Sequence, residues 1–208
     1  MKARYLLFLI GFFVLFSCKK DDKGTLGGSA SPIGALNNTF AISAVPGVQN
    51  FTAKVTGVEG DISTITYTAT VSGSTATTLL DALTNSTISG NSFNRVARYK
   101  ITSEGIQSVY DDGNIILVKY DANVGDEWSG KVNDFEMKRV VTSVSTTDDY
   151  SWNRMLIKVI KVEETGRGLP GVDKVEFIAN HKFGLVGIVV YLEDGSSQQI
   201  SVYSTNTN

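Results

Sequence analysis

The chain has 208 residues, 42% of them hydrophobic, and its 19 lysines and arginines against 21 aspartates and glutamates give a formal net charge of −2. This composition is typical of a globular chain, and the lack of a basic surplus excludes nucleic acid as the expected main partner. A single cysteine and a single histidine leave little for thiol or transition-metal chemistry, so we expect no metal site and no cofactor.

The N-terminus has the pattern of a secretory signal. A short basic start, Met1–Arg4, precedes an apolar run over residues 5–16, which is shorter than the roughly 20 residues that span a bilayer. The run ends in Leu15-Phe16-Ser17-Cys18, which resembles the lipobox of bacterial lipoproteins, in particular those of the Bacteroidota. The resemblance implies that residues 1–17 are removed and that Cys18 carries acyl chains such as palmitate, which anchor the protein in the outer membrane.

A charged segment follows the cysteine. It consists of Lys19, Lys20, Asp21 and Asp22, and it resembles the export signal of Bacteroidota surface lipoproteins. The resemblance implies display on the cell surface. The alternative is a solvated spacer on an anchor that faces the periplasm.

A linker rich in glycine and serine comes next. Residues 24–38 have low apolar content and no periodicity, which predicts a flexible tether. We therefore divide the chain into a signal peptide, a lipidated and tethered segment over residues 18–39, and a single β domain over residues 40–208.

The domain is rich in Thr, Val, Ile and Ser, which favour strands. Along Thr64–Val71 four threonines alternate with Ile65, Tyr67, Ala69 and Val71, so the latter are predicted to face the core.

Acidic and glycine-containing turns divide the predicted strands. Asp112-Gly113 and Asp194-Gly195 are predicted hairpin turns, and Asp148-Asp149 is expected to separate a strand over residues 135–145 from one over residues 152–164.

One segment is predicted to be helical. Ser74 is the expected N-cap of a helix over residues 75–84, with Leu79, Leu80 and Leu83 on one face. The predicted fold is therefore mainly β, an antiparallel meander of roughly nine to eleven strands with one short helix. A twisted sheet, a half-open barrel and a sandwich all satisfy this pattern.

Two segments of the domain resemble a broad group of uncharacterised Bacteroidota lipoproteins. Val124-Gly125-Asp126-Glu127-Trp128 and His181–Gly187 are similar to strand-opening segments of that group. The resemblance covers about residues 100–203 and implies a partly rolled antiparallel sheet without an established activity.

Few residue patterns indicate catalysis. Gly166–Gly171 has the G-x-G-x-x-G spacing, but a predicted strand follows it where a dinucleotide site needs a helix, so it is interpreted as a strand connection. The sequence contains no G-x-S-x-G motif, so His181 has no serine nucleophile of that type to activate. Most acidic residues lie at predicted turns. We therefore predict no catalytic residue and no enzyme.

Aromatic side chains give the clearest binding signal. Tyr150, Trp152, Asn153 and Arg154 form a predicted turn with two rings, an amide and a guanidinium, and Trp128 lies near another strand end. Exposed Trp and Tyr side chains stack on sugars and anchor interfaces. The alternative is that both tryptophans are buried in the core, as large aromatic residues mostly are.

Three functions stay open. The sequence favours a non-catalytic cell-envelope lipoprotein whose β domain binds a glycan or an envelope protein, or has a structural role. A half-open barrel that carries an apolar ligand is the alternative, and it requires an internal cavity of about 300 Å³ or more. A carbohydrate-active hydrolase would need two carboxyl groups roughly 5–9.5 Å apart in a cleft.

Overall fold

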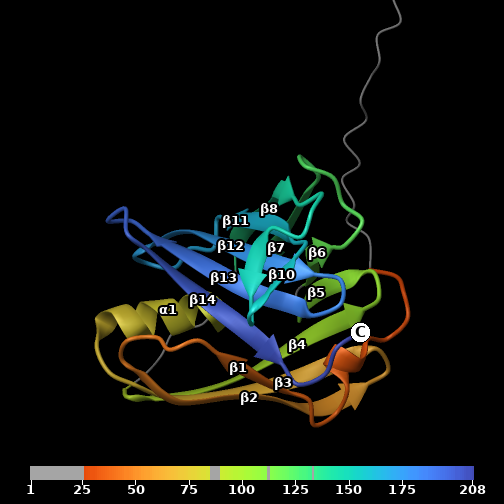
Figure 1. Ribbon diagram of the computed structural model, residues 1–208. Helices are drawn as coiled ribbons and strands as arrows, with labels where there is room; N and C mark the ends of the chain where they lie inside the picture. Colours follow the sequence, from red (N-terminus) through yellow and green to blue (C-terminus); the bar gives the residue numbers. More distant parts are fainter. Residues whose placement is uncertain (1–25, 85–89, 112, 133) are drawn as a thin grey trace, which may run out of the picture.

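The computed structural model describes residues 26–84, 90–111, 113–132 and 134–208. The predicted fold class is confirmed: a twelve-stranded antiparallel meander forms a nearly closed barrel (Figure 1). The signal peptide, Cys18 and the charged segment Lys19, Lys20, Asp21 and Asp22 lie outside the described residues.

The barrel strands follow the order β6-β5-β4-β3-β2-β1-β14-β13-β12-β11-β8-β7. One half of the sheet contains β1 (Thr39–Ile42), β2 (Val48–Glu59), β3 (Ile62–Val71), β4 (Ser92–Thr102), β5 (Gly105–Tyr110) and β6 (Gly113–Lys119). The other half contains β7 (Glu127–Val132), β8 (Phe135–Val144), β11 (Ile160–Thr165), β12 (Val172–Asn180), β13 (Gly184–Leu192) and β14 (Ser197–Ser204). The pairing of β1 with β14 joins the two halves, and β6 and β7 lie side by side where the ladder ends.

The alternation predicted for residues 64–71 is confirmed in β3. Ile65, Ala69 and Val71 are buried, whereas threonines of the outer face form cross-strand hydrogen bonds, including one of 2.6 Å between the hydroxyl groups of Thr52 and Thr68. Half-buried Tyr67 also points inward and lines the interior of the barrel. The strand therefore has one solvated face and one face that belongs to the core.

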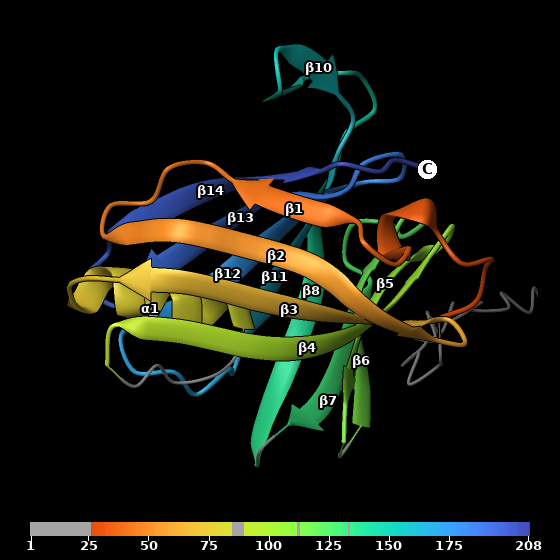
Figure 2. The same cartoon turned by 90° about the horizontal axis from the view of Figure 1, so that it is seen from below.

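The predicted helix is present as α1 (Ser74–Thr84) and closes one end of the barrel (Figure 2). Ser74 is its first residue rather than a cap before it. Leu79 and Leu80 are buried as expected, whereas the side chain of Leu83 lies outside the described residues. Leu80 belongs to the same hydrophobic cluster as Phe93 of β4, so the helix packs against the inner face of the sheet.

The strand predicted over residues 152–164 is interrupted. β9 (Tyr150–Trp152) and β10 (Met155–Ile157) form a hairpin outside the barrel ladder, and β11 pairs directly with β8. The turn residues Asn153 and Arg154 have φ angles of 45° and 64°, which reverse the chain. Figure 2 shows this hairpin projecting from the barrel.

The folded domain begins N-terminal to the expected start near Phe40. Leu26 is only 1% exposed, and the 3₁₀-helix η1 (Pro32–Gly34) places Ile33 in the main core. The buried amide of Asn38 donates to the carbonyl of Ile33. Much of the segment predicted to be a tether therefore packs against the barrel.

Candidate functional site: an internal cavity

The interior of the barrel contains a cavity of about 590 Å³. Side chains from both halves of the sheet line it, so closure of the meander creates it. Its volume falls within the range of about 300–1,000 Å³ that is typical of small-molecule sites. The size required for a carrier of an apolar ligand is therefore met.

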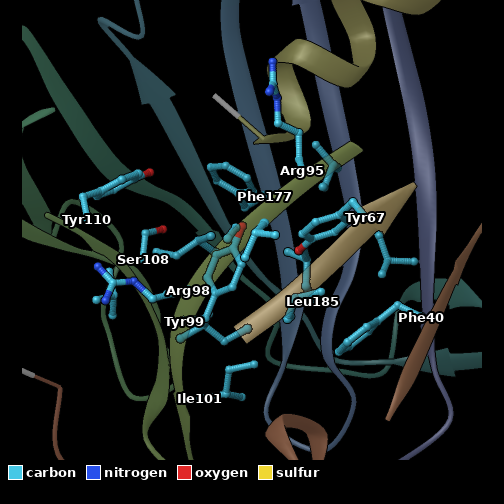
Figure 3. A pocket seen from close by; sticks show the side chains of 18 of the residues that line it. Phe40, Tyr67, Arg95, Arg98, Tyr99, Ile101, Ser108, Tyr110, Phe177 and Leu185 are labelled. Carbon is cyan, nitrogen blue, oxygen red and sulfur yellow. The ribbon is translucent and has the colours of Figure 1, made fainter. Parts of the chain in front are cut away.

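Most of the cavity wall is apolar. Phe40 and Leu185 lie at one side of it, with Ile101 below them (Figure 3). The apolar lining also includes residues of η1 and of several strands, among them Ile33, Ile42, Ile65, Ala97, Ile106, Ile188, Ile200 and Val202. A hydrocarbon group that bound in this space would be removed from water, and its van der Waals contacts with the cavity wall would replace those with the solvent.

The cavity reaches the surface beside β4. This strand pairs with β5 only from Arg98 to Thr102, whereas its ladder with β3 begins at Ser92. Val96 of this strand lines the cavity and is 62% exposed. Arg98 and Asp111, which form an ion pair of 2.5 Å, lie at the same opening.

A buried triad of charged side chains lies at the polar side of the cavity, and its two arginines line the wall. Glu164 of β11 accepts a hydrogen bond of 2.5 Å from Nε of Arg139 on β8, and it also accepts one from Arg167 in the loop after β11. Arg139 and Glu164 are each only 1% exposed. This set, called the Arg-Glu-Arg triad below, contains two cations and one anion.

The triad connects parts of the fold that the ladder does not join. Arg139 donates through Nη1 to the carbonyls of Ile115 and Ile116, at 3.0 and 2.9 Å, and so links β8 to β6 across the open seam. Arg167 donates to the carbonyl of Ala82 in the last turn of α1. The triad therefore fixes both the seam and the closing helix.

The glycine-rich loop holds Arg167 in place. It links β11 to β12, as predicted, and Gly166 and Gly168 have φ angles of 80° and 69°. A Cβ atom on Gly166 would lie 2.1 Å from the carbonyl oxygen of Glu136. Glycine is required there because the backbone passes this close to β8.

The guanidinium groups keep Glu164 ionised. Burial alone would raise the pKa of the Glu164 carboxyl, but the adjacent Arg139 and Arg167 outweigh that effect and lower this pKa.

Three tyrosines complete the polar wall. Tyr67, Tyr99 and Tyr110 line the cavity from β3, β4 and β5 (Figure 3). Tyr67 interacts electrostatically with Tyr99, and Tyr110 with Arg139. Burial raises the pKa of Tyr67 and of Tyr99, so both phenols retain their protons.

Carboxylate groups are sparse around the cavity. Among the described residues Asp111 is the carboxylate that lines it, while Glu164 lies behind the wall within the triad. Asp111 is paired with Arg98, and Glu164 with Arg139 and Arg167, so these two acids do not form the pair of carboxyl groups that a glycoside hydrolase needs. Over the described ranges, no group of three or more His, Cys, Asp and Glu side chains is placed to hold a metal ion.

The predicted aromatic residues lie elsewhere. Trp128 belongs to the main core, and Trp152 packs on the outer face of the sheet, with Tyr150 beside it. The Nε1 atom of Trp152 donates to the carbonyl of Val202 at 3.0 Å. Asn153 and Arg154 are exposed at the hairpin turn. Both indole rings are therefore engaged by the protein itself, and a glycan-binding or protein-binding role for this group stays a prediction.

Comparisons with known proteins provide no further guide. No family model matches the chain, and no similar curated protein or solved structure was found. Within the described residues, the helix is too short to cross a membrane. The functional argument therefore rests on the cavity and on the sequence of the N-terminus.

Proposed function

We propose that this protein is a lipid-anchored envelope protein whose barrel binds a small, largely apolar molecule in its internal cavity. The observation that carries this proposal is the cavity of about 590 Å³ with its predominantly apolar wall. The proposed anchor, Cys18, would hold the barrel at the outer membrane, on the cell surface or facing the periplasm, where apolar molecules are concentrated.

Binding inside the barrel agrees better with the geometry than binding at the predicted aromatic group. A cavity that is already formed avoids the cost of rearranging the core. The two tryptophans, in contrast, would have to leave their packed positions before a sugar could stack on them. Carbohydrate hydrolysis receives less support, because Asp111 is ion-paired with Arg98 and Glu164 with two arginines.

The cavity can be tested by filling it. Ala97 is a half-buried cavity residue of β4, so Ala97→Trp should occupy the space and lower ligand binding about tenfold, equivalent to about 1.4 kcal/mol. The full chain would be reconstituted in phospholipid vesicles with a photoactivatable diazirine derivative of hexadecanol, and crosslinked peptides would be mapped by mass spectrometry.

The matched control for this substitution is Asn94→Trp. Asn94 lies on the same strand but is exposed and does not line the cavity, so crosslinking should be unchanged. Absence of crosslinks at cavity residues in the wild-type protein would contradict the proposed function.

The anchor has a separate test. Cys18→Ala removes the sulfur atom that the lipobox would acylate, so incorporation of an alkyne-labelled palmitate should be lost. Click labelling of the immunoprecipitated protein measures this, and Ser17→Ala serves as the neighbouring control. Undiminished labelling of Cys18→Ala would show that the lipobox interpretation is wrong.

A further inference from the structure

We infer that the cavity selects an amphiphile with an anionic, carboxylate-type head group, which Tyr99 and Tyr110 bind in front of the Arg-Glu-Arg triad. This inference rests on the proposed function and adds the chemical class of the ligand. Three observations support it: the hydrogen-bonding capacity of the tyrosines, the sign of the charge behind them, and the contrast between the two sides of the cavity.

The tyrosines retain donors that the protein does not need. Tyr110 lines the cavity beside Arg139, and a guanidinium can only donate, so the Tyr110 O–H remains for another acceptor. Tyr67 and Tyr99 both line the cavity, and two neighbouring phenols can share at most one hydrogen bond, so at least one O–H of this pair remains available. The same wall of the cavity therefore presents two phenol donors, which matches the two oxygens of a carboxylate.

The charge behind these donors is positive. The triad has two guanidinium groups and one carboxylate, and it is shielded from solvent. Tyr99 experiences the charge of both Arg139 and Arg167, so an anion bound to Tyr99 would be attracted by them as well. Such an attraction is stronger in a poorly solvated interior than in water.

The aromatic ring of Phe177 lies close to both guanidiniums at the cavity wall. The Arg139 and Arg167 guanidinium carbons lie 5.6 and 5.8 Å from its centroid, so the ring helps to hold both cations in position. Because Glu164 and backbone carbonyls already occupy several of their donors, the arginines act through their charge and through the tyrosines.

The remainder of the cavity suits a hydrocarbon tail. In Figure 3, Phe40 and Leu185 lie on the side of the cavity away from Tyr110. A ligand with one polar end would satisfy both the phenol donors and the apolar wall. A neutral hydrocarbon that displaced water from the cavity would leave the phenols without acceptors, which costs free energy.

The experiment compares two probes that differ only in the head group. Full-length protein in phosphatidylcholine vesicles is photolysed with the diazirine derivative of hexadecanoic acid or of hexadecanol at pH 7.4, and crosslinks to cavity peptides are quantified. The acid should label these peptides about tenfold or more above the alcohol, because hydrogen bonds to a charged acceptor are stronger than those to a neutral one.

Substitution of the tyrosines assigns the preference to the phenols. In the double variant Tyr99→Phe/Tyr110→Phe the acid should lose most of its advantage over the alcohol, while labelling by the alcohol persists. Tyr150→Phe is the matched control, because the Tyr150 hydroxyl accepts from Gln199 and does not line the cavity.

The outcomes separate the two proposals. If neither probe labels cavity peptides, the proposed function fails. If both probes label them equally, or if the double variant keeps the preference for the acid, the cavity still binds apolar ligands but the assignment of a carboxylate head group is overturned.

Discussion

Replacing Glu164 by glutamine is expected to lower the free energy of unfolding by about 3–5 kcal/mol, because it leaves two buried guanidiniums without their shared carboxylate. For a domain of this size the loss corresponds to a fall of roughly 6–20 °C in Tm. Thermal unfolding followed by circular dichroism measures the effect.

The neighbouring residue provides a matched control. Glu163 faces outward and forms an ion pair of 2.7 Å with Lys174, and both side chains are about one-third exposed. Glu163→Gln should cost no more than about 1 kcal/mol, since exposed pairs contribute little. Equal effects of the two substitutions would contradict the structural role of the triad.

The order of effects within the triad follows from charge. Arg139→Met leaves Glu164 paired with Arg167, so the remaining pair is neutral, although the carbonyls of Ile115 and Ile116 lose a donor. It should therefore destabilise the protein less than Glu164→Gln does.

The pH dependence of the free energy of unfolding gives a second measure of how much the Glu164 carboxylate contributes to stability. The pKa of Glu164 is lower in the folded protein than in the unfolded chain, so its contribution is present above about pH 4.5 and is lost as the pH falls through the folded pKa. The difference between wild type and Glu164→Gln should consequently shrink below about pH 4.5.

Local patterns in the sequence suffice for the fold class. The alternation along residues 64–71 and the Asp194-Gly195 turn each depend on neighbouring residues, and both predictions are confirmed. Closure of the barrel depends instead on β1 and β14, which pair Phe40 with Ser204. Residues so far apart in the chain leave no periodic signal that specifies their pairing, so sheet, sandwich and barrel could not be distinguished.

The sequence contains a partial signal for the Arg-Glu-Arg triad. Arg139 alternates with Met137 and Val141, which places a cation on the apolar face of a predicted strand. Glu163 and Glu164 are adjacent, however, and only the register of β8 against β11 decides which of them meets Arg139. The cavity combines side chains from both halves of the sheet, so no segment of the sequence could indicate it.

Trp152 illustrates the opposite limit: its burial is one of the two alternatives that the sequence predicts, but the side chains and the carbonyl that it contacts are not predictable from the sequence. Its ring is only 6% exposed and lies 4.7 Å from the ring of Phe183 and 5.6 Å from that of Tyr203, between centroids. The β13–β14 ladder runs only as far as the pair Gly187 and Ser201. The indole N–H therefore bonds the carbonyl of Val202 just beyond the point where the ladder stops.

Trp152→Ala should consequently destabilise the protein by about 3–5 kcal/mol, because it removes a buried ring and a hydrogen bond to the backbone. Trp152→Phe keeps most of the packing but leaves the Val202 carbonyl without its donor, so its cost should be about 1–3 kcal/mol. Urea unfolding gives both values, and Leu156→Ala, at a side chain 60% exposed on the same hairpin, should stay within about 0.5 kcal/mol of wild type.

The measured stability of Trp152→Ala also determines how a loss of glycan or protein binding in that variant should be interpreted. If Trp152→Ala unfolds as predicted, any loss of binding in that variant reflects the collapse of the hairpin rather than a lost contact. Arg154→Ala tests the surface itself, because Arg154 is exposed at the turn and its removal leaves the packing of Trp152 intact. A stable Trp152→Ala variant, within about 0.5 kcal/mol of wild type, would contradict the structural role and return the indole to the candidates for binding.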